Sequence, residues 1–393
     1  MHGIAALTAA YVLSQFFRSF LAVLTPALGA DLGATKADLS QASGAWFVVF
    51  ALAQFGVGMA LDRFGPRRTA AILLAVGGGG GSVLFASAGS PHAITAAMGL
   101  IGLGCAPVLM AAFFLFARNF PPARFAFLGS TMVGVGNLGN VVGAAPLAAA
   151  AETFGWRPVM LALGLIALAV AGAIMLFVKD PPRAEGHAGL SGFGELLRLR
   201  TLWPLIPLTA LNYAPVAGIR GLWAGPYLNE AFGADALTIG NATLGMALAM
   251  VAGNLAYGPL DRLFNSRKWV VLAGNSVVLT VLTALVFWIG AGIWVSALAM
   301  AVIGLFGSSY ALLMAHARAF IPPHLTGRGV TLMNFYSIGG VGLMQLATGT
   351  VVSSASMPTD PLAAWRALMI FYAVTLGLAL LAYLFSRDAK PEL

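Results

Sequence analysis

The feature that most constrains this chain is its series of long apolar segments, each close to the roughly 20 residues that an α-helix needs to cross a lipid bilayer. Charged residues make up only 9% of the 393 residues and hydrophobic residues 60%, with a mean hydropathy of +0.90. So few charges cannot cover the surface of a soluble protein, which excludes a soluble enzyme, a nucleic-acid-binding domain and a disordered chain. Twelve candidate spans can be marked, at residues 4–27, 39–61, 69–88, 92–118, 125–149, 157–178, 201–228, 237–259, 269–290, 293–320, 329–354 and 364–386.

The spans fall into two groups of six, separated by one longer connection. Residues 179–200 hold prolines, glycines and charges, a composition typical of a linker. We therefore predict an N-terminal six-helix bundle at 1–178, a cytoplasmic linker at 179–200 and a C-terminal six-helix bundle at 201–393. The single cysteine, Cys105, excludes a disulfide framework and a cysteine-rich metal site. We expect no cofactor and no bound metal.

The positions of the basic residues predict how the chain lies across the membrane. If the N-terminus is cytoplasmic, 16 of the 21 Lys and Arg residues fall in inside loops, and three, Lys36, Arg157 and Arg366, fall in outside loops. Cytoplasmic loops of membrane proteins carry an excess of basic residues. We therefore expect both termini on the cytoplasmic side of a bacterial inner membrane. The two remaining basic residues, Arg18 and Arg220, lie within spans.

The two halves of the sequence resemble each other at offsets of 199 to 209 residues. The segment GMALDRFGPRR at 58–68 matches GPLDRLFNSRK at 258–268, and ARNFPPAR at 117–124 matches ARAFIPPH at 317–324. Two further matches join Trp156-Arg157 to Trp365-Arg366, and Arg18 with Pro26 to Arg220 with Pro226. Four matches in the same order predict a duplication, and hence two bundles related by a pseudo-twofold axis along the membrane normal.

The twelve spans, the duplication and the loop motif at 58–68 resemble the major facilitator superfamily (MFS) over the whole chain. The resemblance implies an all-α membrane protein with the MFS fold and a secondary transporter that works by alternating access. The loop motif would then be a conformational latch, in which a carboxylate accepts from an arginine or caps a helix in one state only. The alternative is a solvated loop that follows the charge bias. The latch candidates are Gly58, Asp62, Arg63, Gly65, Arg67, Arg68, Arg118, Asp261, Arg262 and Arg318.

Arg18 and Arg220 are the main substrate-binding candidates because each lies within a span. A cation at the centre of a membrane helix costs roughly 2.5–3.5 kcal/mol on insertion scales and normally has a counter-ion. All 13 Asp and Glu residues fall in loops or at span ends, so we expect the substrate to be that counter-ion. Arginine suits carboxylate and phosphate alike, and the choice between these anions stays open. The alternative is that each arginine is structural.

The segment YVLSQFFRSFLAVLTPAL at 11–28 is similar to the first helix of the superfamily's organophosphate and organic-anion transporters. These carry an arginine on the first helix and, in the antiporters, another on the seventh. His316 and Glu152 are candidates for proton coupling, and the alternative for His316 is an interfacial residue. Other polar residues within spans are substrate-binding candidates, although each can equally serve helix packing: Tyr11, Gln15, Gln54, Asn137, Asn212, Tyr213, Asn334 and Tyr336.

The predicted function is secondary active transport of a small organic anion, bearing a carboxylate or a phosphate, by anion exchange or proton-linked symport. Two alternatives stay open: a drug or metabolite exporter of the same fold, and a transporter-like sensor or assembly factor. No catalytic cluster of His, Cys, Asp and Glu is visible, so we expect no enzyme. The expected partners are the anionic substrate and the lipid bilayer, without nucleic acid, and we expect a monomer.

Overall fold

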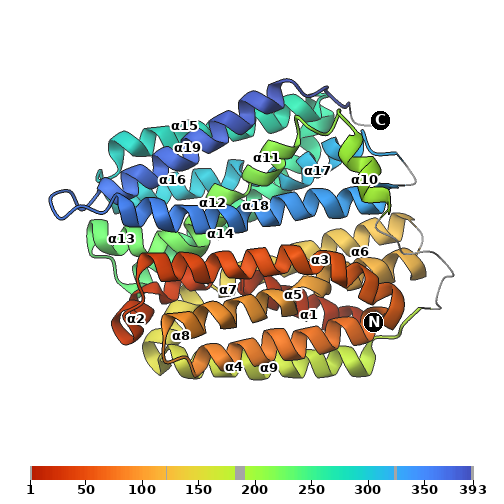
Figure 1. Cartoon of the computed structure of the whole chain (residues 1–393), viewed down its shortest axis with the longest axis horizontal. Helices are drawn as coiled ribbons and strands as arrows, with labels where there is room; N and C mark the ends of the chain where they lie inside the picture. Colours follow the sequence, from red (N-terminus) through yellow and green to blue (C-terminus); the bar gives the residue numbers. More distant parts are fainter. Residues whose placement is uncertain (1, 121, 182–190, 323–324, 391–393) are drawn as a thin grey trace. The chain divides into compact units, whose positions relative to one another are not determined.

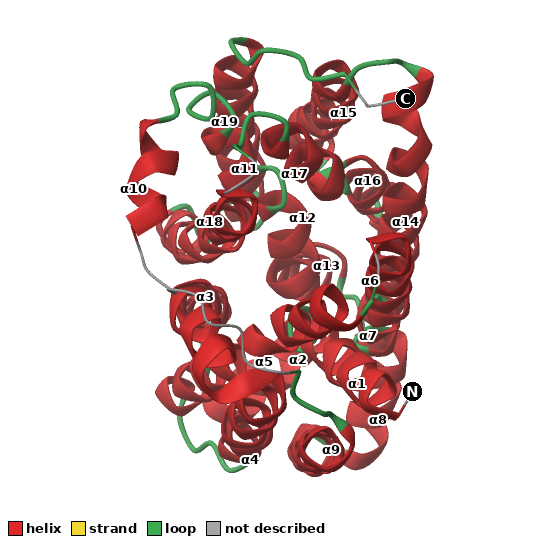
Figure 2. Cartoon of the chain, turned by 90° about the vertical axis from the view of Figure 1, so that its right-hand side faces the viewer, coloured by secondary structure: helices red, strands yellow, loops and turns green. Residues whose placement is uncertain are grey.

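The computed structural model describes residues 2–120, 122–181, 191–322 and 325–390, apart from the side chains of residues 62, 117, 122–127, 130, 191–193, 326 and 327. The chain divides into two compact units, residues 1–188 and 189–393. The described part is mainly helical and contains no extended β-strand (Figure 2). The predicted all-α fold is confirmed.

In the first unit, six helical crossings follow one another (Figure 1). Two of them are broken: α1 and α2 meet at an angle of 54°, and residues 131–142 meet α8 at 41°. The element α3 contains the second crossing and the start of the third, which are separated by a kink at Gly65, and η1 and α4 complete the third crossing. The elements are α1 (His2–Phe16), α2 (Leu21–Leu32), α3 (Lys36–Leu73), the π-helical η1 (Leu74–Gly80), α4 (Gly81–Ala86), α5 (Pro91–Asn119), α6 (Pro122–Gly136), α7 (Leu138–Val142), α8 (Ala145–Phe154) and α9 (Trp156–Phe177).

In the second unit, the first crossing is built from short pieces, so the predicted span 201–228 corresponds to four elements that run from Ile206 to Phe232. Residues 191–198, assigned above to the linker, form helix α10, which is anchored by the buried side chain of Leu196. The elements are α10 (Ser191–Arg198), α11 (Ile206–Leu211), α12 (Ala214–Gly218), the π-helical η2 (Ile219–Trp223), α13 (Ala224–Phe232), α14 (Ala236–Leu263), α15 (Arg267–Trp288), α16 (Ile293–Phe306), α17 (Tyr310–Arg318), α18 (Thr326–Ser354) and α19 (Ala363–Leu384).

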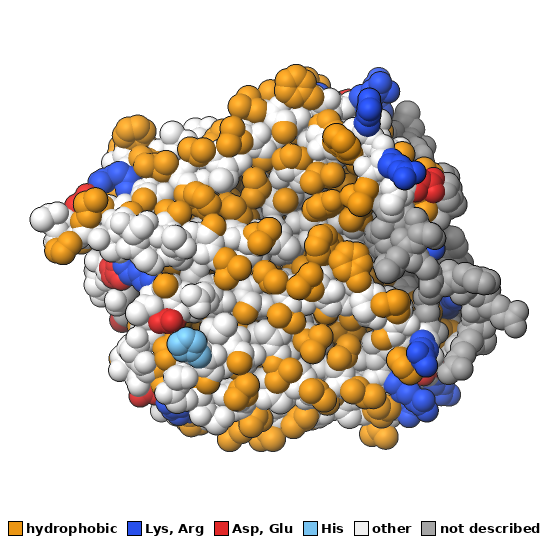
Figure 3. All heavy atoms as spheres, viewed as in Figure 1, with side chains coloured by type: hydrophobic (Ala, Val, Ile, Leu, Met, Phe, Trp, Pro, Cys, Tyr) orange, Lys and Arg blue, Asp and Glu red, His pale blue; other side chains and the backbone are white. Residues whose placement is uncertain are grey.

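On the face shown in Figure 3, apolar side chains are spread along the helices of both units, and the Lys, Arg, Asp and Glu side chains gather near the two ends. Leu165, Leu255 and Leu298, in the middle of three different helices, are 59%, 73% and 66% exposed. Large aliphatic side chains exposed along whole helices are stable in hydrocarbon, which is as apolar as leucine itself. The chain is therefore a multi-pass membrane protein.

The duplication is visible in the backbone. Gly33 ends α2 and Gly233 ends α13, both in the left-handed conformation, with φ of 63° and 66°. Close packing repeats as well. A side chain at Gly139 would overlap the carbonyl oxygen of Val12, and one at Gly340 would overlap that of Ala210. The first and fifth crossings of each unit therefore touch backbone to backbone at related positions.

Candidate functional site

Arg18 lies at the break between α1 and α2. Its backbone N–H donates to the carbonyl of Gln15, three residues earlier, at 3.4 Å, so the regular α-helical pattern is interrupted here. Its guanidinium carbon lies 5.4 Å from the ring centroid of Trp46 and 5.0 Å from that of Phe50, both on α3. Aromatic faces attract a guanidinium at these distances. The two rings hold Arg18 in place without neutralising its charge.

Within the part of the chain that the structure describes, no acidic side chain pairs with Arg18 to neutralise its charge. The ion pairs found there join Arg157 to Asp31, Arg267 to Asp261 and Arg366 to Asp360. The buried Nε of Arg18 also has no hydrogen-bond partner among the described residues. Arg18 is thus a cation whose donors are available to an anionic ligand.

Three predicted site residues lie on α1 and α3, the helices that supply the residues before Arg18 and its aromatic contacts. Gln15 Nε2 donates to the hydroxyl of Tyr11 at 3.0 Å, one turn earlier on α1. Gln54, on α3, donates through Nε2 to the carbonyl of Ala106 on α5 at 3.2 Å. All three side chains are buried, so the first unit holds polar side chains within its helix packing on both α1 and α3.

Arg220 lies in η2, the π-helical turn that interrupts the first crossing of the second unit, and it is only 2% exposed. π-helical turns are rare and are frequent at functional sites. In the same turn, Trp223 Nε1 donates to Thr348 Oγ1 on α18 at 3.0 Å. Both arginines singled out from the sequence therefore lie where their helix is distorted, in the first crossing of their own unit.

The other substrate-binding candidates lie in several local settings. Asn212 Nδ2 donates to Asn275 Oδ1 at 2.8 Å and to Ser309 Oγ at 2.7 Å, so this amide links three helices of the second unit. Asn334 Oδ1 accepts from the Tyr310 hydroxyl at 2.7 Å. These contacts are consistent with packing, and a substrate-binding role for them stays a prediction. Asn137 accepts from Asn140 at 3.2 Å, and the side chains of Tyr213 and Tyr336 are half-buried.

The loop motif of the first unit forms a turn around Gly65, whose φ is +84°. A side chain at this glycine would overlap the carboxylate of Asp180, just beyond α9. Asp180 Oδ1 accepts from the backbone N–H of Arg67 at 2.8 Å, and Arg67 Nε donates to the carbonyl of Met175 at 2.5 Å. The start of the third crossing is thus bonded to the end of the sixth. The side chain of Asp62, the predicted latch carboxylate, lies outside the described residues.

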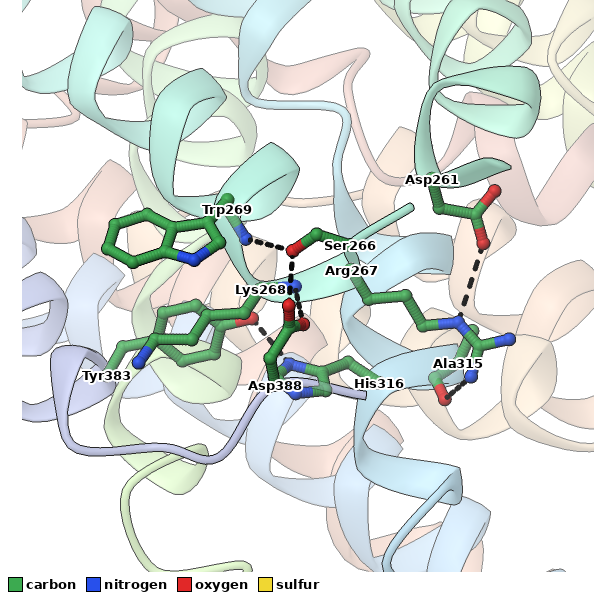
Figure 4. Close-up of polar contacts among 9 residues, drawn as sticks. All are labelled: Asp261, Ser266, Arg267, Lys268, Trp269, Ala315, His316, Tyr383 and Asp388. Carbon is green, nitrogen blue, oxygen red and sulfur yellow. Dashed lines mark hydrogen bonds and ion pairs between the residues drawn. The ribbon is translucent and has the colours of Figure 1, made fainter. Parts of the chain in front are cut away.

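Side chains of the related turn in the second unit are drawn in Figure 4. Asn265 has a φ of +48° and takes the place of Gly65, 200 residues earlier in the sequence. Asp388, just beyond α19, accepts from the backbone N–H of Lys268 at 3.0 Å and from Ser266 Oγ at 2.6 Å. Partial burial raises the pKa of Asp388, but these hydrogen bonds more than offset it, so the pKa lies below its usual value. Asp261, the second predicted latch acid, pairs with Arg267 Nε at 3.4 Å.

His316 lies beside this turn and is fully buried (Figure 4). Its Nε2 lies 2.8 Å from the carbonyl oxygen of Arg387, and its Nδ1 lies 2.6 Å from the hydroxyl of Tyr383. Because a carbonyl oxygen only accepts, Nε2 carries the proton, and in the neutral ring Nδ1 accepts from Tyr383. One ring nitrogen therefore contacts α19 through Tyr383 and the other contacts the segment that follows it. Proton coupling through His316 stays a prediction.

At the opposite end of each unit, the arginine of the repeated Trp-Arg pair begins the last helix. Arg157 donates to the carbonyls of Ala86 and Ala88 at 3.2 and 2.7 Å, and it pairs with Asp31 at 3.1 Å. In the second unit, Arg366 donates to the carbonyl of Val286 at 3.3 Å and pairs with Asp360 at 3.0 Å. The hydrogen bond from Arg366 lowers the pKa of Asp360. Glu152, the second coupling candidate, is exposed near the end of α8.

The remaining latch candidates lie on the surface near the two turns. Arg63 and Arg118 are exposed, with their guanidinium carbons 5.3 Å and 5.5 Å from the rings of Phe64 and Phe114. Three more arginines, Arg68, Arg262 and Arg318, are exposed, and Gly58 lies within α3.

The sequence prediction missed the two aspartates that bind the turns. Asp180 and Asp388 each follow the last helix of their unit by a few residues, and this shared position was the available signal. It also missed Phe50 as a contact of Arg18, since phenylalanine is common along all the spans.

Curated relatives include transporters and a sensor. The chain is 25% identical over 287 residues to the membrane sensor protein UhpC of Salmonella typhimurium, covering 66% of this chain and 63% of that protein. It is 23% identical over 287 residues to the probable sulfoacetate transporter SauU of Cupriavidus necator, covering 68% and 66%. It is 24% identical over 297 residues to the probable L-galactonate transporter of Escherichia coli, covering 68% and 62%. These matches span less than two thirds of the relatives' own length.

Solved transporter structures share the fold. A bacterial homolog of the human lysosomal transporter Spinster, in an inward-facing and occupied conformation, matches with a TM-score of 0.77 at 19% identity, covering 98% of this chain and 96% of that one. The nucleoside transporter NupG matches with a TM-score of 0.77 at 12% identity, covering 98% and 99%. At these identities the likeness concerns the fold alone. The sequence model of the Major Facilitator Superfamily matches residues 7–222 and again 205–393. The chain therefore belongs to the Major Facilitator Superfamily, a family of membrane transporters.

Proposed function

We propose that this protein is a secondary transporter of small organic anions in a bacterial inner membrane, with both termini in the cytoplasm. The observation that carries the proposal is Arg18. Its guanidinium is held against two aromatic rings at a helix break, and no acidic side chain of the described residues pairs with it. An arginine keeps its charge when it is removed from water. An anionic substrate is the counter-ion that this arrangement favours.

Arg220 is the second proposed anion-binding residue. It lies at a helix distortion in the related crossing of the second unit and is buried. A guanidinium presents several N–H donors in one plane, which match the oxygens of a carboxylate or a phosphate in pairs. Arg220 therefore offers an anion the same donor geometry as Arg18.

The proposed mechanism is exchange of one anion for another, or symport in which protons accompany the anion. A carrier that reorients without its anion must close around the charge of Arg18, for which the described residues supply no acidic partner. The cost of that charge rises steeply as the surroundings lose water, and arginine cannot relieve it by losing a proton. A bound anion neutralises the guanidinium, so the loaded carrier reorients faster than the empty one. The turn at residues 62–68 would act as the latch that sets the balance between conformations.

The printed names of two relatives support an anionic substrate. One is a probable sulfoacetate transporter and the other a probable L-galactonate transporter, and both of these compounds are organic anions. A second candidate function, sensing an anion without transporting it, is favoured by the relative that is named a membrane sensor protein. A sensor and a transporter would both bind the anion, but only a transporter would carry it across the membrane.

The test is exchange in liposomes that contain the purified protein. Liposomes loaded with a substrate anion should take up the labelled anion much faster than empty ones. Arg18→Ala and Arg220→Ala should each abolish uptake, and Arg18→Lys should restore little, because a point charge does not replace a planar donor group. Arg200→Ala, at an exposed position in neither site nor turn, is the control.

Three results would contradict the proposal or part of it. Wild-type affinity and uptake in both alanine variants would show that the arginines do not bind the substrate. Anion binding that depends on both arginines, with no uptake under any gradient, would favour the sensor. Equal uptake by loaded and empty liposomes, without dependence on a pH gradient, would exclude exchange and proton symport and indicate uniport.

A further inference from the structure

The surroundings of Arg18 combine hydrogen-bond donors with hydrogen-bond acceptors. Buried atoms of both kinds have no partner in the described part of the chain: the donors Arg18 Nε and Trp46 Nε1, and the acceptors Gln15 Oε1 and Gln54 Oε1. Gln15, Trp46 and Gln54 are 7%, 0% and 1% exposed, so bulk water does not reach them in this conformation. Buried polar groups nearly always carry a hydrogen bond. These four atoms therefore define what a ligand must offer at this place.

Gln54 is the best-defined acceptor. Its Nε2 donates to the carbonyl oxygen of Ala106. Because a carbonyl oxygen only accepts, turning the amide over would break this bond, and Oε1 stays the atom that needs a donor. Gln15 is less constrained, since its Nε2 meets the Tyr11 hydroxyl, which can donate or accept. Whichever way Gln15 is turned, one of its amide atoms still needs a partner.

The residues with unpaired atoms come from the end of α1, from the break that follows it and from α3. Trp46, Phe50 and Gln54 are spaced four residues apart on α3 and share one face. The guanidinium of Arg18 lies over the first two of these side chains, and Gln15 is three residues before Arg18. Eight residues of helix rise about 12 Å. A ligand whose head binds Arg18 therefore needs a chain of several atoms to reach Gln54.

From this arrangement we infer that the substrate is a hydroxylated organic anion, whose anionic head accepts from Arg18 and Trp46 and whose hydroxyl groups donate to Gln54 and Gln15. The inference rests on the proposed function, because it assigns the anionic head to Arg18. An ammonium group would also donate to the glutamines, but it would lie near a guanidinium that has no acidic partner in the described residues, and like charges repel strongly away from water. An anion without donors would leave Gln54 Oε1 buried and unpaired, which lowers affinity.

The test compares anions that differ only in their hydroxyl groups. Binding of erythronate and butyrate, and of glycerol 3-phosphate and propyl phosphate, is measured by titration calorimetry on the purified full-length protein. We expect the hydroxylated member of at least one pair to bind about tenfold more tightly, since one hydrogen bond to a buried amide is worth roughly that factor. Which pair shows the effect distinguishes a carboxylate head from a phosphate head.

A variant tests whether Gln54 causes the preference for the hydroxylated anion. Gln54→Met keeps the size of the side chain and removes the acceptor, so it should bring the two members of the pair to within about threefold of each other, chiefly by weakening the hydroxylated one. Gln41→Met, at an exposed position earlier on α3, is the matched control and should keep the full preference.

The outcomes separate this inference from the proposed function. Tight binding of butyrate and propyl phosphate, equal to that of their hydroxylated partners, would overturn the inference and leave an anion site at Arg18. Loss of the preference in Gln41→Met, or its retention in a folded Gln54→Met, would also overturn it. If none of the four anions binds the wild-type protein, the anion site itself fails and the inference falls with it. The wild-type comparison needs no variant to fold.

Discussion

His316 offers a sharp test of how the second unit is held together at its turn. The ring contacts the carbonyl of Arg387 and the hydroxyl of Tyr383, at 2.8 and 2.6 Å, and it is fully buried. If its role is to anchor the segment after α19, replacing it should cost stability and leave the transport reaction of the folded protein unchanged. If His316 instead carries a coupled proton, replacing it should change transport and leave the stability of the protein unchanged.

The size of the effect follows from the bonds that are lost. Tyr383→Phe removes one hydrogen bond and should lower the free energy of unfolding by about 1 kcal/mol. His316→Leu removes two and leaves the partly buried carbonyl of Arg387 and the buried hydroxyl of Tyr383 unpaired, so the expected loss is about 2–3 kcal/mol. The double variant should cost about 1 kcal/mol less than the sum, because the two residues share one of these bonds.

The measurement has two parts. Equilibrium unfolding in mixed detergent micelles gives the three free energies, and anion exchange in liposomes, normalised to folded protein, gives the rate and its pH dependence. His92→Leu, at an exposed histidine of the first unit, is the control and should change neither. An unchanged unfolding free energy in His316→Leu, together with a lost pH dependence of exchange, would refute the anchoring role and support proton coupling.

Three further predictions concern other parts of the chain. Asp62→Asn should slow exchange without changing substrate affinity, because a latch sets the balance of conformations and not the pocket; a large loss of affinity at a normal rate would contradict this. Gly139→Ala should lower the free energy of unfolding by about 1–3 kcal/mol, because the added methyl group overlaps a backbone carbonyl. Gly134→Ala is the control and should leave that free energy unchanged, since nothing lies within 4 Å of the added methyl group. Equilibrium unfolding of both variants measures the difference. The Asp360 carboxyl has a lowered pKa in the folded protein, so its ionised form stabilises the fold at pH values above about 3.9, the pKa of an unfolded aspartate. This small contribution to the free energy of unfolding should disappear as the pH falls through the pKa of the folded state. When the free energy of unfolding is measured against pH, the contribution should be absent in both Asp360→Asn and Arg366→Ala.

Most of the fold was predictable because the bilayer imposes strict requirements on sequence. A crossing helix needs an apolar segment of fixed length, and basic residues gather on one side, so spans and charges could be read together. The duplication was predictable because each half keeps the same charged and aromatic residues at related places, such as Arg157 and Arg366. Each of these features lies within a short stretch of sequence, so it can be recognised without knowing how the helices pack.

The distortions within the helices were harder to predict from the sequence. The break that contains Arg18 has the sequence Phe-Arg-Ser-Phe at 17–20, with neither proline nor glycine to mark it. Helix α10 was missed because its serine and glycine residues favour a loop, and burial of Leu196 outweighs that preference. Tertiary packing overrides weak local propensity in both places.

The candidate site was only partly predictable, for a similar reason. Arg18 is visible in the sequence because a charge within an apolar segment is rare, but its aromatic contacts are not, since the chain has 25 phenylalanines and 8 tryptophans. The bond from Arg67 to Asp180 joins residues 113 positions apart, and that from Lys268 to Asp388 joins residues 120 apart. No periodicity indicates such pairs.

The bonds at the helix ends indicate which parts of each unit move. In the first unit, Asp180 binds the start of the third crossing and Arg157 binds its end, so the third and sixth crossings are joined at both ends. Asp388 and Arg366 make the related bonds in the second unit. Helices joined at both ends move as one body. Distortions with fewer regular backbone bonds occur in the first crossings, beside Arg18 in one unit and around Arg220 in the other, and also at η1 in the third crossing and at the bend before α8. If the two arginines bind the substrate as proposed, anion binding would act directly on two of the distorted elements.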